Sequence, residues 1–60
     1  MSEIKKILME RDGMSEAEAS DLIKEATEDL NARLLEGDSS AEDICSEYFG
    51  LEPDYLMELL

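Results

Sequence analysis

Residues 15–36, SEAEASDLIKEATEDLNARLLE, carry the clearest structural pattern in this 60-residue chain. Ser15 and Glu18 have the spacing of a capping box, so we expect a helix to begin at Ser15 and run to about Glu36. At 1.5 Å per residue it would be about 32 Å long and would form the spine of the molecule. Apolar residues recur in it at steps of three and four, which predicts one inward-facing stripe: Ala19, Leu22, Ile23, Ala26, Leu30 and Leu34.

Three more helices are predicted around this spine, separated by Gly13, Gly37 and Gly50. Glycine readily adopts the left-handed conformation that ends many helices. The first of the three is expected over residues 2–12. Its helical spacing gives one narrow stripe, formed by Ile4, Ile7, Leu8 and Arg11.

The third helix is expected to open at residues 38–40, where either Ser39 with Glu42 or Ser40 with Asp43 could cap it. Its apolar face would consist of Ala41, Ile44, Cys45, Tyr48 and Phe49. The fourth helix is short and begins at Pro53, which suits the first helical position because its missing N–H would be unpaired there. One side of it is predicted to gather Tyr55, Leu56, Leu59 and Leu60, with Met57 off to the side.

These elements predict an all-α fold, a single small helical domain over residues 1–60. β-branched residues are scarce and no segment alternates apolar with polar residues, so no strand is expected. We expect a small bundle of three principal helices plus a short C-terminal helix. Its core is predicted to contain Ile7, Leu8, Leu22, Ile23, Ala26, Leu30, Ile44, Tyr48, Phe49 and Leu56.

The charge of the chain is strongly negative. Seventeen acidic side chains accompany five basic ones, which gives a formal net charge of −12. Direct binding of nucleic acid or of an anionic membrane is therefore not expected. Residues 37–60 carry seven of the acids and no base.

No catalytic site, metal or cofactor is predicted, and the chain is interpreted as no enzyme and as having no small-molecule substrate. It has no histidine, the commonest acid–base catalyst. Cys45 is expected to be structural, because acidic surroundings disfavour a reactive thiolate. A calcium-binding loop that started at Asp38 would have Asp43 where glycine is needed and Phe49 where a bidentate glutamate is needed.

The length and composition of the chain also bear on its stability, its self-association and its location in the cell. A folded chain this small has a thin margin of stability, and one cysteine cannot form an internal disulfide. Self-association is the remaining way to add buried surface, which makes a homodimer plausible. The N-terminal residues lack an apolar stretch of signal-peptide length, and a free thiol fits a reducing compartment, so a cytoplasmic location is expected.

Two surfaces are candidates for binding a partner. Glu18, Asp21, Glu25 and Glu28 form an acidic face on the long helix. Its simpler interpretation is a solvated face, and its sharper one is a row of carboxylates that imitates phosphates and occupies a basic groove. The second candidate is an apolar patch of Tyr55, Met57 and Leu60, which either closes the core or contacts a partner or a second copy.

Two stretches add a resemblance: ERDGMS at residues 10–15 and GLEPDYL at residues 50–56. With the acidic helix between them, they resemble short uncharacterised proteins of bacteriophages and integrated mobile elements. The resemblance spans most of the chain, implies a bacterial or viral setting and assigns no functional residue. The sequence thus favours a protein–protein interaction module, with a nucleic-acid-mimicking inhibitor of a DNA- or RNA-binding protein as the alternative.

Overall fold

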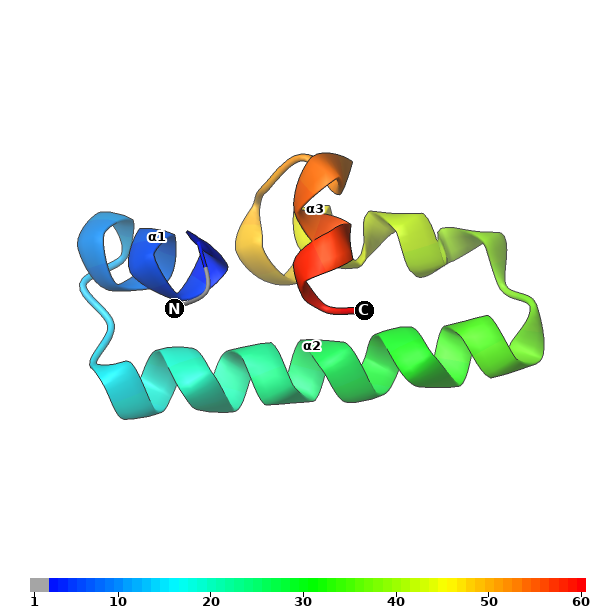
Figure 1. Cartoon of the computed structure of the whole chain (residues 1–60), viewed down its shortest axis with the longest axis horizontal. Helices are drawn as coiled ribbons and strands as arrows, with labels where there is room; N and C mark the ends of the chain where they lie inside the picture. Colours follow the sequence, from blue (N-terminus) through cyan, green and yellow to red (C-terminus); the bar gives the residue numbers. More distant parts are fainter. Residues whose placement is uncertain (1–2) are drawn as a thin grey trace.

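The computed structural model describes residues 3–60, and every regular element in that range is a helix. The prediction of an all-α protein is confirmed: no strand occurs among these residues. Along the chain (Figure 1) the elements are α1 over Glu3–Arg11, α2 over Glu16–Glu36, the 3-10 helix η1 over Ser39–Asp43, α3 over Ile44–Phe49 and the 3-10 helix η2 over Pro53–Glu58.

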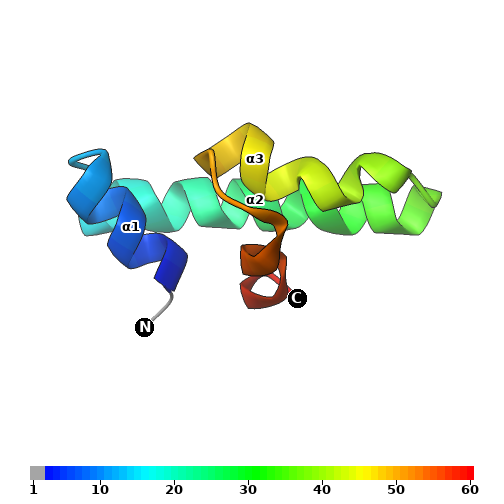
Figure 2. The same ribbon diagram turned by 90° about the horizontal axis from the view of Figure 1, so that it is seen from above.

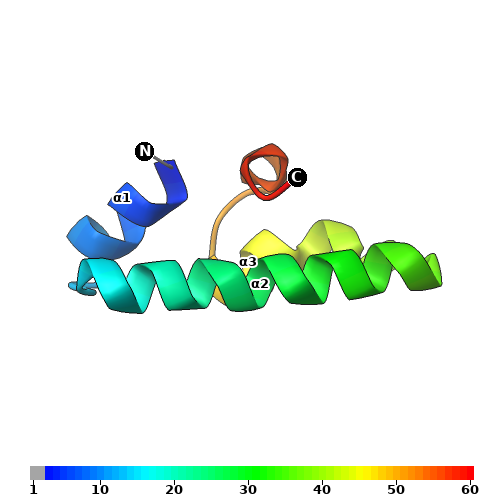
Figure 3. The ribbon, with the colours of Figure 1, turned by 60° about the horizontal axis from the view of Figure 1, so that its bottom comes forward.

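Helix α2 is the spine, and its predicted start is confirmed. The N–H of Glu18 donates to Ser15 Oγ at 3.1 Å, and the N–H of Ser15 donates to Glu18 Oε1 at 3.0 Å, which completes the capping box. Gly37 ends the helix in the left-handed conformation at φ 69°. All the other elements lie on one side of α2 (Figures 1 and 3), so the helix has one covered face and one open face.

The core lies between α2 and the elements that pack against its covered face. Ten side chains form one buried cluster: Ile4, Leu8, Ala19, Ala26, Leu30, Ala41, Ile44, Cys45, Phe49 and Leu59. Of the predicted core residues outside this cluster, four are partly buried against it: Leu22, Ile23, Tyr48 and Leu56. Ile7 was predicted in the core but is only half-buried, and Ile4 takes that place. Ile4 and Leu8 are one turn apart on the side of α1 that the core covers, and Ile7 lies at its edge.

The predicted inner stripe of α2 is wrong at its last residue. Leu34 is 51% exposed, because Arg33 instead turns toward η1 and α3, where it bonds to Ser40 and Glu47. The long aliphatic stem of arginine can lie along an apolar surface while its head makes polar contacts.

The predicted first and third helices differ in detail from the observed ones. Helix α1 ends at Arg11, and the proposed start at Ser2 lies outside the described residues. The third predicted helix begins as η1 and continues as α3, and neither predicted cap forms. Asp38 caps it instead, because its extended backbone lets Oδ1 accept the N–H of Ser40 at 2.8 Å.

The C-terminal segment forms η2, which lies near the middle of the long axis of the molecule (Figure 1) and contacts α3, η1 and α1. It stands beside α3 and apart from α2 (Figure 2). Pro53 opens it as predicted, and Glu58 Oε1 accepts the N–H of Ile4 at 3.2 Å, which ties η2 to the first turn of α1. Leu60 was predicted on the inner side but is 74% exposed, whereas Leu59 is buried.

Gly50 joins α3 to η2, and its replacement by alanine is expected to destabilise the fold. Gly50 has φ 65°, and the N–H groups of Gly50 and Leu51 donate to carbonyls of the last turn of α3. A Cβ there would meet open space except for Arg11 Nη1 at 3.9 Å, so the penalty is conformational. We expect Gly50→Ala to cost about 1 kcal/mol in the free energy of unfolding. Urea denaturation checks this; an unchanged midpoint would contradict the left-handed cap.

Candidate interaction surfaces

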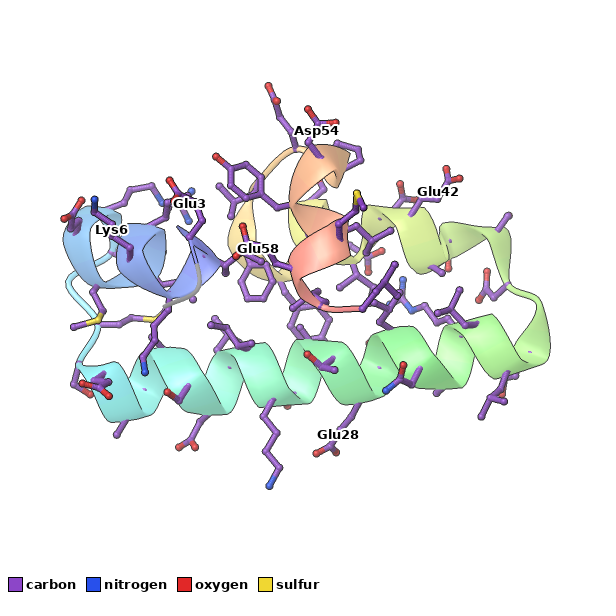
Figure 4. The ribbon with its side chains drawn as sticks, viewed as in Figure 1. Glu3, Lys6, Glu28, Glu42, Asp54 and Glu58 are labelled. Carbon is purple, nitrogen blue, oxygen red and sulfur yellow. The ribbon has the colours of Figure 1, made fainter. Side chains whose placement is uncertain are left out.

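The open face of α2 carries a regular row of side chains, which we name the outer face. It consists of Ala17, Asp21, Lys24, Glu28, Asn31 and Leu35, in alternating steps of four and three residues. Each of these residues is exposed, and Leu35 is 89% exposed. Figure 4 shows Glu28 pointing away from all the other elements. The row lies opposite Ala19, Ala26 and Leu30, which the core buries.

The four acidic residues proposed from the sequence do not form one equivalent row. Glu18 is engaged in the capping box, where the N–H of Ser15 holds the pKa of its carboxyl below the usual value. Asp21, Glu25 and Glu28 are exposed, and the structure gives them no hydrogen bond or ion pair within residues 3–60. Lys24 lies one turn from both Asp21 and Glu28, so it interrupts the negative charge of the row.

The apolar patch proposed for the tail divides into two parts. Tyr55 is half-buried and packs against the core cluster. Met57 and Leu60 are exposed, at 80% and 74%. The tail therefore both closes the core, through Leu59 and Tyr55, and presents two apolar side chains to solvent.

A polar cluster around Arg33 joins α2 to the C-terminal elements. Arg33 Nε donates to Asp29 Oδ1 at 3.0 Å, across one turn of α2. Arg33 Nη1 donates to Glu47 Oε2 at 2.9 Å and to the carbonyl of Ser40 at 3.1 Å. The hydroxyl of Tyr48 donates to Asp29 Oδ2 at 2.7 Å. One arginine thus links α2, η1 and α3.

A second arginine also reaches the acidic C-terminal segment. Arg11 donates through Nη2 to the carbonyl of Phe49 and forms a two-bond pair with Asp12. The pair with Arg11 lowers the pKa of the Asp12 carboxyl. Because residues 37–60 contain no base, their basic contacts must come from residues 1–36, and Arg11 and Arg33 both supply such contacts.

The cluster around Arg33 makes stability depend on pH. The Tyr48 hydroxyl and Arg33 lower the pKa of Asp29, and Arg33 lowers the pKa of Glu47. A carboxyl whose pKa is lowered on folding stabilises the fold above its ordinary pKa, near 4, and loses that contribution as the pH falls through its folded value. Relief of the repulsion among the other carboxylates acts in the opposite direction.

Asp29→Asn separates the two effects, because the amide cannot titrate. We expect the free energy of unfolding of this variant to fall less between pH 5 and pH 3 than that of the wild type, by urea denaturation at each pH. Asp21→Asn, on the outer face, is the matched control and should follow the wild type. If Asp29→Asn shows the full acid sensitivity of the wild type, the Asp29 contacts do not couple folding to protons.

The surroundings of Cys45 and of the acidic side chains bear on thiol and metal chemistry. The thiol of Cys45 is buried in the core, and burial, together with the charge of Glu58, raises its pKa. Within residues 3–60 no three side chains of histidine, cysteine, aspartate or glutamate gather in a way that could hold a metal ion. Nor does any described helix combine the length and the apolar character that crossing a membrane requires.

Sequence reasoning missed two features of these surfaces. The contacts of Arg33 with Ser40 and Glu47 reach 7 and 14 positions along the chain, past the end of α2, and no local pattern signals them. The outer face had a signal: a second series of steps of three and four runs from Ala17 to Leu35, opposite the apolar stripe. It was overlooked because only its acidic members were considered.

Comparison with protein-family models, with curated proteins and with solved structures found no match for this chain.

Proposed function

We propose that this protein is a non-enzymatic protein-binding module of the cytoplasm and that its binding surface is the outer face of α2. One observation carries the proposal: the longest helix has every other element on one side, and its opposite face is exposed from Ala17 to Leu35. An isolated exposed leucine is ordinary. Leu35, however, ends an exposed row in steps of four and three residues along one face of α2, and helices bind other helices through such faces.

Affinity capture from an extract of the source cells tests this proposal when two matched variants are compared. Leu35→Glu places a charge on the outer face, where Leu35 is 89% exposed, and Leu60→Glu places the same charge on the tail, where Leu60 is 74% exposed. Both positions are exposed, so both variants should fold, which circular dichroism checks. We expect Leu35→Glu to lose the proteins that the wild type retains and Leu60→Glu to keep them.

If Leu60→Glu loses the retained proteins and Leu35→Glu keeps them, the binding surface is the tail, where Met57 and Leu60 are exposed. Equal retention by both variants would contradict binding through either apolar surface. If the wild type retains nothing that a charge-matched control protein does not, the proposal of a protein-binding module fails.

Mimicry of nucleic acid is the second candidate function. The exposure of the carboxylates of Asp21, Glu25 and Glu28 supports it. These carboxylates are exposed, have no hydrogen-bonding partner within residues 3–60 and follow steps of three and four along α2. A row at about 5.4 Å per turn could occupy a groove that binds phosphates. The resemblance to proteins of bacteriophages and mobile elements agrees with such an inhibitor. Lys24 weighs against it, because it places a positive charge inside the row.

Salt dependence distinguishes mimicry from apolar docking. A mimic should bind a basic DNA- or RNA-binding protein with an affinity that falls steeply with added salt, and Asp21→Lys combined with Glu25→Lys should abolish that binding. Survival of the complex after both reversals would contradict mimicry.

A further inference from the structure

We infer that the outer face of α2 binds a second copy of this chain, with the two α2 helices antiparallel. This rests on the proposed function and names the partner of the same surface. The steps from Ala17 to Leu35 average 3.6 residues, the period of a straight α-helix, so the six side chains lie on one face that a neighbouring helix can contact along its length. Because every residue of the outer face is exposed, a second helix can approach it without displacing another element.

The outer face is complementary to the same face of a second copy when the two helices run in opposite directions. An antiparallel pair that brings Lys24 opposite Glu28 of the second copy also brings Asp21 opposite Asn31 and Ala17 opposite Leu35. Each match occurs twice, because the pair is symmetric. The first match joins opposite charges, the second can form a hydrogen bond between carboxylate and amide, and the third sets a large apolar side chain against a small one.

Other arrangements lose these matches. A parallel pair in register would set Lys24 against Lys24 and Glu28 against Glu28, so like charges would oppose each other along the outer face. An antiparallel pair shifted by one step, with Lys24 opposite Asp21, keeps an ion pair but leaves Leu35 beyond the overlap. Only the first register both pairs Lys24 and covers Leu35, the most exposed of the large apolar side chains within residues 3–60.

Repulsion between negative charges limits the strength of this dimer in two ways. Each copy carries −12, so the two repel each other at a distance. Glu25 flanks the outer face and would face Glu25 of the second copy near the symmetry axis. We therefore expect a weak dimer that moderate salt strengthens by screening. Glu25→Gln, which removes the facing charges, should strengthen it.

Charge exchange at Lys24 and Glu28 tests the inference by sedimentation equilibrium from micromolar to millimolar concentration. Lys24→Glu and Glu28→Lys should each weaken self-association, on the order of tenfold or more. An equimolar mixture of the two variants should recover it as a heterodimer, because every 24–28 contact is then between opposite charges. The double variant should recover it as a homodimer.

Glu28→Lys separates specific pairing from total charge. It lowers the net charge from −12 to −10, so total charge alone would strengthen association, whereas the inferred pairing predicts weakening. Tighter association of Glu28→Lys, or no recovery in the mixture, would overturn the inference. A wild type that is monomeric at millimolar concentration in moderate salt would overturn it too. Retention of another protein that depends on Leu35 would then still leave the proposed function standing.

Discussion

Phe49→Ala is expected to remove about 3–5 kcal/mol from the free energy of unfolding, the usual cost of truncating a buried phenylalanine. Phe49 is 2% exposed and is the largest side chain buried in the core. It ends α3, and its carbonyl accepts a hydrogen bond from Arg11 of α1. A 60-residue domain has only about 3–9 kcal/mol in total at typical stability per residue. The variant should therefore lose at least about a third of its total stability at 25 °C.

Circular dichroism with urea denaturation measures this effect, and Met57→Ala is its control. Met57 is 80% exposed, so its truncation should change stability by less than about 0.5 kcal/mol. A Phe49→Ala protein that stays folded with a midpoint near that of the wild type would mean that the ring is not packed in the core as described.

Replacing Arg33 with methionine is expected to release the C-terminal elements from α2. Methionine keeps much of the apolar stem but removes every hydrogen bond to Asp29, Ser40 and Glu47. Asp29 and Glu47 would then face each other as negative charges with no cation between them. We expect amide hydrogens in residues 44–49 to exchange on the order of tenfold faster or more, with a smaller effect in the middle of α2.

Lys24→Met is the matched control for this prediction. It removes the same charge from the same helix, but Lys24 lies on the outer face, where the structure gives it no hydrogen bond or ion pair within residues 3–60. Its exchange rates should stay near those of the wild type. If the two variants accelerate exchange in residues 44–49 equally, net charge governs the stability of the segment, and the contacts of Arg33 do not.

Local signals in the sequence were sufficient for α2. The capping box of Ser15, the glycine end at residue 37 and the ion pair of Asp29 with Arg33 all follow from spacing within one or two turns, and all three are present. The all-α class follows from the same periodicity.

The errors occur where the backbone leaves the ordinary α-helical period. In η2 the 3-10 geometry has three residues per turn, so Leu56 and Leu59 fall on one side and Leu60 turns outward. A period of 3.6 had grouped Leu59 with Leu60. At residue 34 the period was correct, but nothing nearby in sequence indicated that Arg33 would turn toward η1 and α3.

The candidate site was predictable only in part. Three of the four acidic residues chosen from the sequence are exposed and make no hydrogen bond or ion pair within residues 3–60. The charge of Lys24 and the exposure of Leu35 nevertheless change what the surface can bind. Which face of α2 stays open depends on where α1 and the C-terminal elements pack, and that packing is set by contacts between distant residues.

Solvent paramagnetic relaxation of methyl groups tests most directly the claim that α2 has one covered face and one open face. With a soluble gadolinium chelate and dilute, methyl-labelled protein, we expect Ala17, Ala32 and Leu35 to relax strongly and Ala19, Ala26 and Leu30 to be protected. Strong relaxation of Ala19 and Ala26 would mean that α2 stands free on all sides. Protection of Leu35 would mean that the outer face is covered within one chain, and either result would contradict the account.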